Sequence, residues 1–254
     1  SSRPALFWDI LKNEHRKLFG AALLLALFSL PFVALHIFTD FELLMLQKDD
    51  VSETWPYYIF LAILPISAAI YGIGIGGILR IVRRLCYLEP VFFWEDFKLG
   101  IKQNAKQCVF FCFFIGVSFS ICYLGRISHS EDILWNIPFG IFALIVFPCL
   151  LFSFVPMATY SNSFMQNLSL SSRLYLKAFL TNIIPLALFL SPLFLEFIPD
   201  LAVKYIVFLL FSILIWPLLL LGFFLYQTFL LDKYINKEKF PALYDRGIHR
   251  KKKN

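Results

Sequence analysis

Six long apolar runs, separated by shorter polar segments, set the pattern of this chain. A helix needs about 20 mostly apolar residues to cross the roughly 30 Å hydrocarbon layer of a bilayer, and the runs are close to this length or longer. They lack the two-residue alternation of a membrane β-barrel, so we predict helices, which satisfy their own backbone groups in lipid. The predicted spans are 18–37, 57–81, 108–124, 134–160, 178–198 and 202–231.

Composition favours a membrane protein and argues against the soluble classes. Of the 254 residues, 59% are apolar and 16% are charged, whereas an average globular domain is about half apolar and about a quarter charged. One soluble core of this size cannot hide that much apolar surface from water. A soluble enzyme, a disordered chain and a repeat scaffold are therefore disfavoured. We predict a single all-α integral membrane bundle over residues 1–254.

The basic residues indicate the orientation of the spans. If both termini lie in the cytosol, 20 of the 23 Lys and Arg residues fall in cytosolic segments, including a basic tail at 232–254. Only Lys48, Arg126 and Lys204 then fall outside. The positive-inside rule predicts this bias, so we expect six spans with N-in, C-in topology. The net charge of +6 then reflects sidedness, and nucleic acid is not an expected partner.

Small residues form a ridge in the second span. Ala68, Gly72 and Gly76 recur every four residues, a spacing that lets another helix approach closely. The stretch from Gly72 to Gly77 also matches the dinucleotide-binding pattern G-x-G-x-x-G, but that loop must connect a strand to a helix in a soluble unit. We therefore expect helix packing at this ridge, with a partner helix either in the same chain or in another subunit.

The connector at 89–107, before the third span, has the pattern of an amphipathic helix. Such a helix is typical of the membrane interface, where its lysines face anionic headgroups. The same pattern also suits a docking surface for a cytosolic partner. One predicted face carries Trp94, Phe97 and Ile101, and the other carries Lys98, Lys102 and Lys106. Segments 5–16 and 161–177 show related patterns that predict further interfacial helices.

Several spans contain proline, and the fourth contains both Pro148 and Pro156. Proline lacks a backbone donor and frees the carbonyl four residues earlier. Membrane helices tolerate this loss when a neighbouring group covers the free carbonyl. The fourth span is therefore predicted to bend, either as part of the shape of the bundle or as a broken helix that forms a substrate site.

The sequence contains no recognisable catalytic or metal-binding pattern. The four His residues lie in separate connectors or at membrane edges, and the five Cys residues lie in or beside apolar runs, without the His or carboxylate partners of a metal shell. Ionisable residues are nearly absent from the spans, with Glu196 the nearest exception. This scarcity disfavours an ion-coupled carrier and a polar channel. We expect no catalytic residue, no cofactor and no metal.

Four features, taken in chain order, carry a family resemblance. They are an amphipathic stretch before a first span with Leu30-Pro31, the pair Leu64-Pro65 followed by small residues, the segment Trp94-Glu95-Asp96-Phe97 with Lys102-Gln103-Asn104, and a long last span that runs into a basic tail. In these features the chain resembles the YesL family of bacterial integral membrane proteins, a domain of unknown function. The resemblance implies association with ABC-type carbohydrate uptake systems and a place in the bacterial plasma membrane. It implies no site residues.

The leading hypothesis is a non-enzymatic accessory subunit of an ABC-type oligosaccharide importer. Its partners would be the lipid bilayer and other membrane subunits, such as the ABC permease or its ATPase. One alternative is a stand-alone channel or facilitator for a small solute. The least favoured is an intramembrane lipid-modifying enzyme that uses Asn104, Asn182 and Glu196. The candidate contact residues are Ala68, Gly72, Gly76, Trp94, Phe97, Lys98, Ile101 and Lys102.

Overall fold

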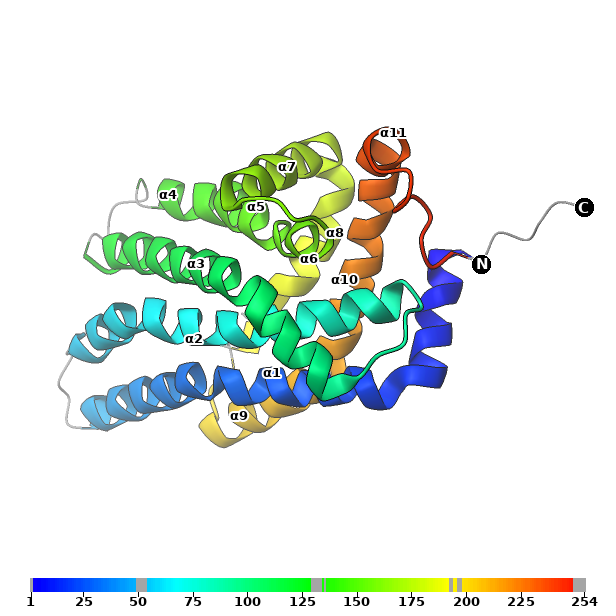
Figure 1. The fold of residues 1–254 in the computed structure, drawn as a ribbon. Helices are drawn as coiled ribbons and strands as arrows, with labels where there is room; N and C mark the ends of the chain where they lie inside the picture. Colours follow the sequence, from blue (N-terminus) through cyan, green and yellow to red (C-terminus); the bar gives the residue numbers. More distant parts are fainter. Residues whose placement is uncertain are drawn as a thin grey trace, which may run out of the picture.

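The structure is a computed structural model that describes residues 2–48, 54–128, 134, 136–191, 194–195 and 198–248. All regular secondary structure in these ranges is helical (Figure 1). The predicted all-α class is therefore confirmed. The helices pack directly on one another, and long apolar helices account for most of the chain.

Five helical segments are long and apolar enough to cross a membrane. They are α1 (Arg3–Lys48), α2 (Trp55–Cys86), α3 (Phe93–Ser128), the segment Phe142–Thr159 and the segment Leu201–Lys239. A sixth crossing arises if α7 (Phe164–Lys177) and α8 (Phe179–Leu190), which meet at 110°, form one bent span. The chain is thus a multi-pass helical membrane protein.

The first three long helices lie side by side, with α2 between α1 and α3 (Figure 1). α1 contains both the amphipathic N-terminal stretch and the first span, with a kink at Glu14. α3 likewise joins the amphipathic connector to the third span in one helix. Exposed apolar side chains are numerous along these helices, as expected for surfaces that face lipid.

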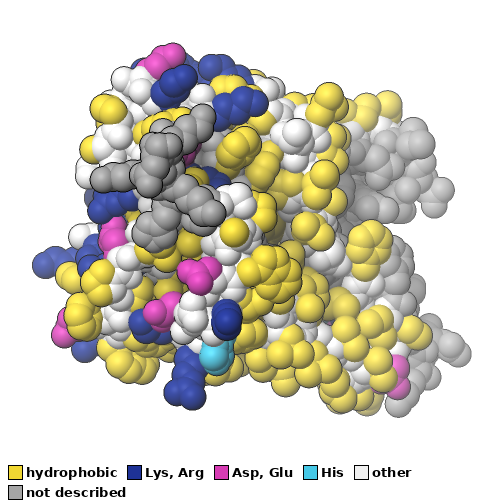
Figure 2. All heavy atoms as spheres, turned by 90° about the vertical axis from the view of Figure 1, so that its right-hand side faces the viewer, with side chains coloured by type: hydrophobic (Ala, Val, Ile, Leu, Met, Phe, Trp, Pro, Cys, Tyr) yellow, Lys and Arg dark blue, Asp and Glu magenta, His cyan; other side chains and the backbone are white. Residues whose placement is uncertain are grey.

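Both ends of the described chain meet at one end of the bundle. The Arg3 guanidinium donates to Thr228 Oγ1 over 2.7 Å and forms an ion pair with Asp232. Arg246 lies 2.8 Å from Glu89, which follows α2. Lys and Arg side chains gather at this end, which we call the basic end, while hydrophobic side chains cover most of the remaining surface in view (Figure 2).

The fourth span is a broken helix. It consists of α4 (Asn136–Ile141), a π-helical turn (Phe142–Val146), α5 (Phe147–Leu151) and α6 (Phe154–Thr159). Pro148 lies in the first turn of α5, just after the π turn, and the chain turns at Phe152 and Ser153 before α6. A wider π turn before proline moves the preceding carbonyls away from the ring.

The helix α8 lies within the fifth predicted span, 178–198. It begins at a sharp bend from α7, next to the predicted start of the span, and ends at Leu190. Ala178 at this bend has φ −119° and ψ 29°, which lies outside the helical region. Glu196 of this predicted span lies outside the described residues.

The predicted basic tail at 232–254 begins as a continuation of the last helical segment. The last span is built from α9 (Leu201–Leu210), a π turn (Phe211–Ile215) and α10 (Trp216–Leu231). Helix then continues through a π turn (Asp232–Asn236) and α11 (Lys237–Lys239). After α11 the chain folds back in turns as far as residue 248, so this part of the tail packs on the bundle.

Candidate functional site

The small-residue ridge packs within this chain. A Cβ added at Gly72 would lie 2.8 Å from the carbonyl oxygen of Cys108 on α3, and one added at Gly76 would lie 2.9 Å from the backbone of Ala105. Both glycines are buried, and Ala68 lies one turn nearer the start of α2. The partner helix that the sequence left open is therefore α3, and the ridge allows the two backbones to touch.

The two predicted faces of the α3 connector lie in different surroundings. Phe97 is 7% exposed, and its ring covers Gly77 of α2, where an added Cβ would overlap the ring. Ile101 is partly buried against the core. Trp94, by contrast, is 60% exposed. The apolar face is thus mostly used to hold α3 on α2, and only its first residue projects from the bundle.

Trp94 heads a stripe of exposed cations. Lys98, Lys102 and Lys106 follow it at steps of four residues on α3, and all three are exposed. None of these lysines forms an ion pair with any residue that the structure describes. We call Trp94, Lys98, Lys102 and Lys106 the α3 platform. It lies at the basic end, beyond the most apolar part of α3.

A buried carboxylate fixes the α3 platform to α2. Asp96 is 1% exposed and accepts from Arg80 Nε over 3.0 Å and from an Arg84 guanidinium nitrogen over 2.5 Å. Its second oxygen accepts from the backbone N–H of Phe92 over 2.8 Å, which closes the first turn of α3. Because a buried carboxylate is stable only with such partners, the start of α3 has one well-defined position.

The C-terminal segment of the chain also contacts the connection between α2 and α3. Glu89 accepts from Arg84 over 3.3 Å and from Arg246 over 2.8 Å. The Arg246 guanidinium also lies 5.4 Å from the centre of the Tyr87 ring, a favourable cation–π distance. Burial raises the pKa of Tyr87 above its ordinary value, so its phenol stays neutral. The platform therefore rests on a rigid base.

A second polar cluster, which the sequence analysis missed, lies at the opposite end of the bundle. Lys204 Nζ lies 2.7 Å from Asp40 Oδ2, and the Tyr205 hydroxyl donates to the same oxygen over 2.8 Å. His36 Nδ1 lies 3.1 Å from the Tyr205 hydroxyl. Lys204, which the charge pattern assigns to the outer side of the membrane, is 6% exposed. In the sequence, the i,i+4 spacing of His36 and Asp40 was the one signal that pointed to this cluster. Lys204 lies 164 residues from Asp40 along the chain, so no local pattern connects them.

Two of the residues considered for lipid chemistry, Asn104 and Asn182, take part in contacts between helices, and the third, Glu196, lies outside the described residues. Asn104 donates to the Gly76 carbonyl of α2 over 3.3 Å. Asn182 donates to the Tyr175 carbonyl over 3.0 Å and accepts from the Tyr226 hydroxyl over 2.8 Å. Both amides thus join helices. In the part of the chain that the structure describes, no group of three or more His, Cys, Asp or Glu residues could hold a metal ion. All five cysteines are free.

Comparisons of the chain with protein families, curated proteins and solved structures gave no match.

Proposed function

We propose that the protein is a non-enzymatic accessory subunit of a transport complex in the bacterial plasma membrane, and that it docks to its partner through the α3 platform. The observation that carries the proposal is an exposed Trp94 in line with three exposed lysines, on a helix start that is held by buried ion pairs. Tryptophan in a rigid setting is a common anchor of protein interfaces. The lysines favour an acidic partner surface.

The substrate class rests on the family resemblance. The YesL-like features favour an ABC-type oligosaccharide importer, whose permease or ATPase would carry the acidic surface. An accessory subunit of such a complex needs no energy-coupling site of its own, because the ATPase drives transport. It does need a membrane bundle and a docking element at the cytosolic side, and the α3 platform supplies the second of these.

Copurification tests the proposal. The tagged protein is extracted from its native host in mild detergent, and the proteins that elute with it are identified by mass spectrometry. We expect permease or ATPase subunits to elute with the wild-type protein. The double variant Lys98→Glu, Lys102→Glu should lose them, because two reversed charges would repel an acidic partner. The matched control Lys12→Glu, Arg16→Glu reverses two exposed cations of α1 and should retain them.

Two results would count against the proposal. One is wild-type protein that elutes alone although permease and binding protein are abundant in the same membranes. The other is equal loss in both charge-reversed variants, which would indicate general attraction to anionic lipid. Solute flux into liposomes that contain only this protein would instead support the stand-alone facilitator.

A further inference from the structure

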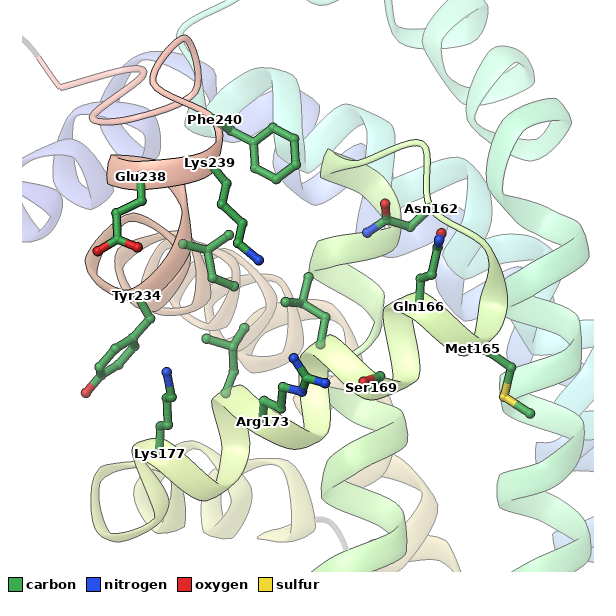
Figure 3. Close-up of a pocket in the computed structure, with 13 residues that line it drawn as sticks. Asn162, Met165, Gln166, Ser169, Arg173, Lys177, Tyr234, Glu238, Lys239 and Phe240 are labelled. Carbon is green, nitrogen blue, oxygen red and sulfur yellow. The ribbon is translucent and has the colours of Figure 1, made fainter.

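A cavity of about 620 Å³ opens at the basic end, between α7 and the final helical segment. α7 forms one wall, and the π turn Asp232–Asn236 with α11 forms the other (Figure 3). We call this cavity the α7 pocket. It shares no lining residue with the α3 platform.

The α7 pocket is lined by more positive than negative charge. Arg173 and Lys177 come from α7, Lys239 comes from α11, and Glu238 is the one acidic residue in the described lining. The three cationic side chains extend into the space between the two walls (Figure 3). None of the three forms an ion pair with a described carboxylate. A ligand with negative charge would therefore find several unpaired cations at one place.

The chemistry of these cations favours phosphate. The planar Arg173 guanidinium can donate two parallel hydrogen bonds to phosphate oxygens, while Lys177 and Lys239 act as point charges. The Lys177 ammonium lies 5.6 Å from the centre of the Tyr234 ring, which helps to hold it at the pocket. Ser169 contributes a hydroxyl from the α7 wall, which can donate to a further phosphate oxygen.

The rest of the pocket and its surroundings are apolar. Leu170, Leu174 and Ile235 line the pocket beside the cations. Outside it, Leu176 is 68% exposed and Leu180 is 80% exposed, just before and after the bend between α7 and α8. In a membrane protein, such side chains face acyl chains. Cations bordered by lipid-facing leucines match an amphiphile with an anionic headgroup better than a soluble anion.

We propose that the α7 pocket binds the phosphate of an anionic phospholipid. The headgroup phosphate contacts Arg173, Lys177 and Lys239, and the acyl chains lie along Leu176 and Leu180. Basic pockets between membrane helices recognise phospholipid headgroups in this way. A bound lipid would fill the gap between the two walls and fix α11 relative to α7.

Native mass spectrometry of the purified full chain tests the proposal. The delipidated protein is titrated with dioleoyl-phosphatidylglycerol or with zwitterionic dioleoyl-phosphatidylcholine. We expect phosphatidylglycerol to bind in preference to phosphatidylcholine. The triple variant Arg173→Gln, Lys177→Gln, Lys239→Gln should weaken phosphatidylglycerol binding by about a hundredfold, since each basic group contributes roughly tenfold or less. The single variant Arg173→Lys should keep part of the affinity, because it keeps the charge.

The matched control removes three exposed cations outside the pocket. Lys12→Gln, Arg16→Gln, Lys237→Gln should bind phosphatidylglycerol like the wild type, because none of these residues lines the pocket. Equal weakening in both triple variants would overturn the proposal, because it would indicate diffuse surface attraction. Unchanged binding in the pocket variant would overturn it as well. The single variant Lys239→Gln repeats the test in case the triple variant misfolds. Lys239 is an exposed position of α11, so its substitution should leave the fold intact and weaken phosphatidylglycerol binding.

A third arm distinguishes a lipid from a soluble phosphate. Inorganic phosphate and glycerol 3-phosphate are titrated against the complex with phosphatidylglycerol. We expect neither to displace the lipid at millimolar concentration, because neither can use the leucines beside the pocket. Displacement at micromolar concentration, lost in the pocket variant, would assign the pocket to a soluble phosphate ligand and would overturn the lipid assignment.

Discussion

At the residue scale, two side chains cover backbone carbonyls that proline leaves free. Pro65 lies four residues after Leu61, whose carbonyl accepts from Ser120 Oγ over 2.7 Å. Pro148 lies four residues after Leu144, whose carbonyl accepts from the Tyr175 hydroxyl over 2.8 Å. The sequence predicted that neighbours must cover such carbonyls. It could not identify them, because each partner comes from another helix.

Loss of the Ser120 hydroxyl should destabilise the bundle. In Ser120→Ala the Leu61 carbonyl has no donor in a region that excludes water, so we expect the free energy of unfolding in detergent to fall by about 1 kcal/mol. Ser118→Ala, two residues away and with no hydrogen bond to another described side chain, should change it by less than about 0.5 kcal/mol. Equal effects of the two variants would show that the carbonyl finds another donor.

Tyr160 makes stability depend on alkaline pH. Its hydroxyl donates to Asn236, and burial raises its pKa above the ordinary value of 10.0. Below pH 10 both folded and unfolded chains keep the proton. Above pH 10 the unfolded chain releases it and the folded chain does not, so the free energy of unfolding falls by up to about 1.4 kcal/mol per pH unit.

Tyr160→Phe should remove this part of the pH dependence. Thermal unfolding in detergent between pH 9 and about pH 11 measures it, and the midpoint of the variant should fall less steeply than that of the wild type. Tyr58→Phe, at a side chain that is 42% exposed, is the control and should follow the wild type. Parallel curves for all three proteins would contradict the prediction. At neutral pH, Tyr160→Phe should cost about 1 kcal/mol through the lost hydrogen bond.

At the element scale, hydrophobicity predicted the helices better than it predicted their breaks. The first three spans appear as parts of α1, α2 and α3, and the amphipathic connector continues directly into α3. The bend between α7 and α8 was not predicted, because a straight helix and a bent helix can have the same content of apolar residues. The bend depends on Asn182, whose amide joins the end of α7 to Tyr226 of α10. A contact with a helix that is distant in the sequence produces no periodic pattern of residues around Asn182.

Asn182→Ala should loosen this bend. It removes the donor to the Tyr175 carbonyl and the acceptor for Tyr226, so α7 and α8 lose their shared tie to α10. Spin labels at Met165 and Ile184, which are 70% and 68% exposed, report the geometry by pulsed electron spin resonance. We expect a broader distance distribution in the variant. Asn162→Ala, which alters an amide just before α7, should leave the distribution unchanged, and a narrow distribution in Asn182→Ala would contradict the role of Asn182.

At the scale of the whole molecule, contacts between the chain ends determine how many times the chain crosses. Arg3 contacts Asp232, so the N-terminal residues and the end of the last span lie on one side. Lys204 contacts Asp40, so α9 begins on the other side. Since Tyr160 also contacts Asn236 at the basic end, the chain between Tyr160 and α9 must cross once. We therefore expect the bent pair α7 and α8 to supply a sixth crossing.

Cysteine accessibility tests this topology. In a background without the native cysteines, single cysteines replace Tyr58 near the start of α2, Lys98 on α3 and Lys237 on α11, all exposed positions. An impermeant maleimide should label Tyr58→Cys in intact cells, and Lys98→Cys and Lys237→Cys only after permeabilisation, because six crossings return the C-terminal segment to the side of the α2–α3 connection. Labelling of Lys98→Cys and Lys237→Cys from opposite sides would require an odd number of crossings and would contradict the bent span. Labelling of both in intact cells would keep six crossings but reverse the orientation that the basic residues predict.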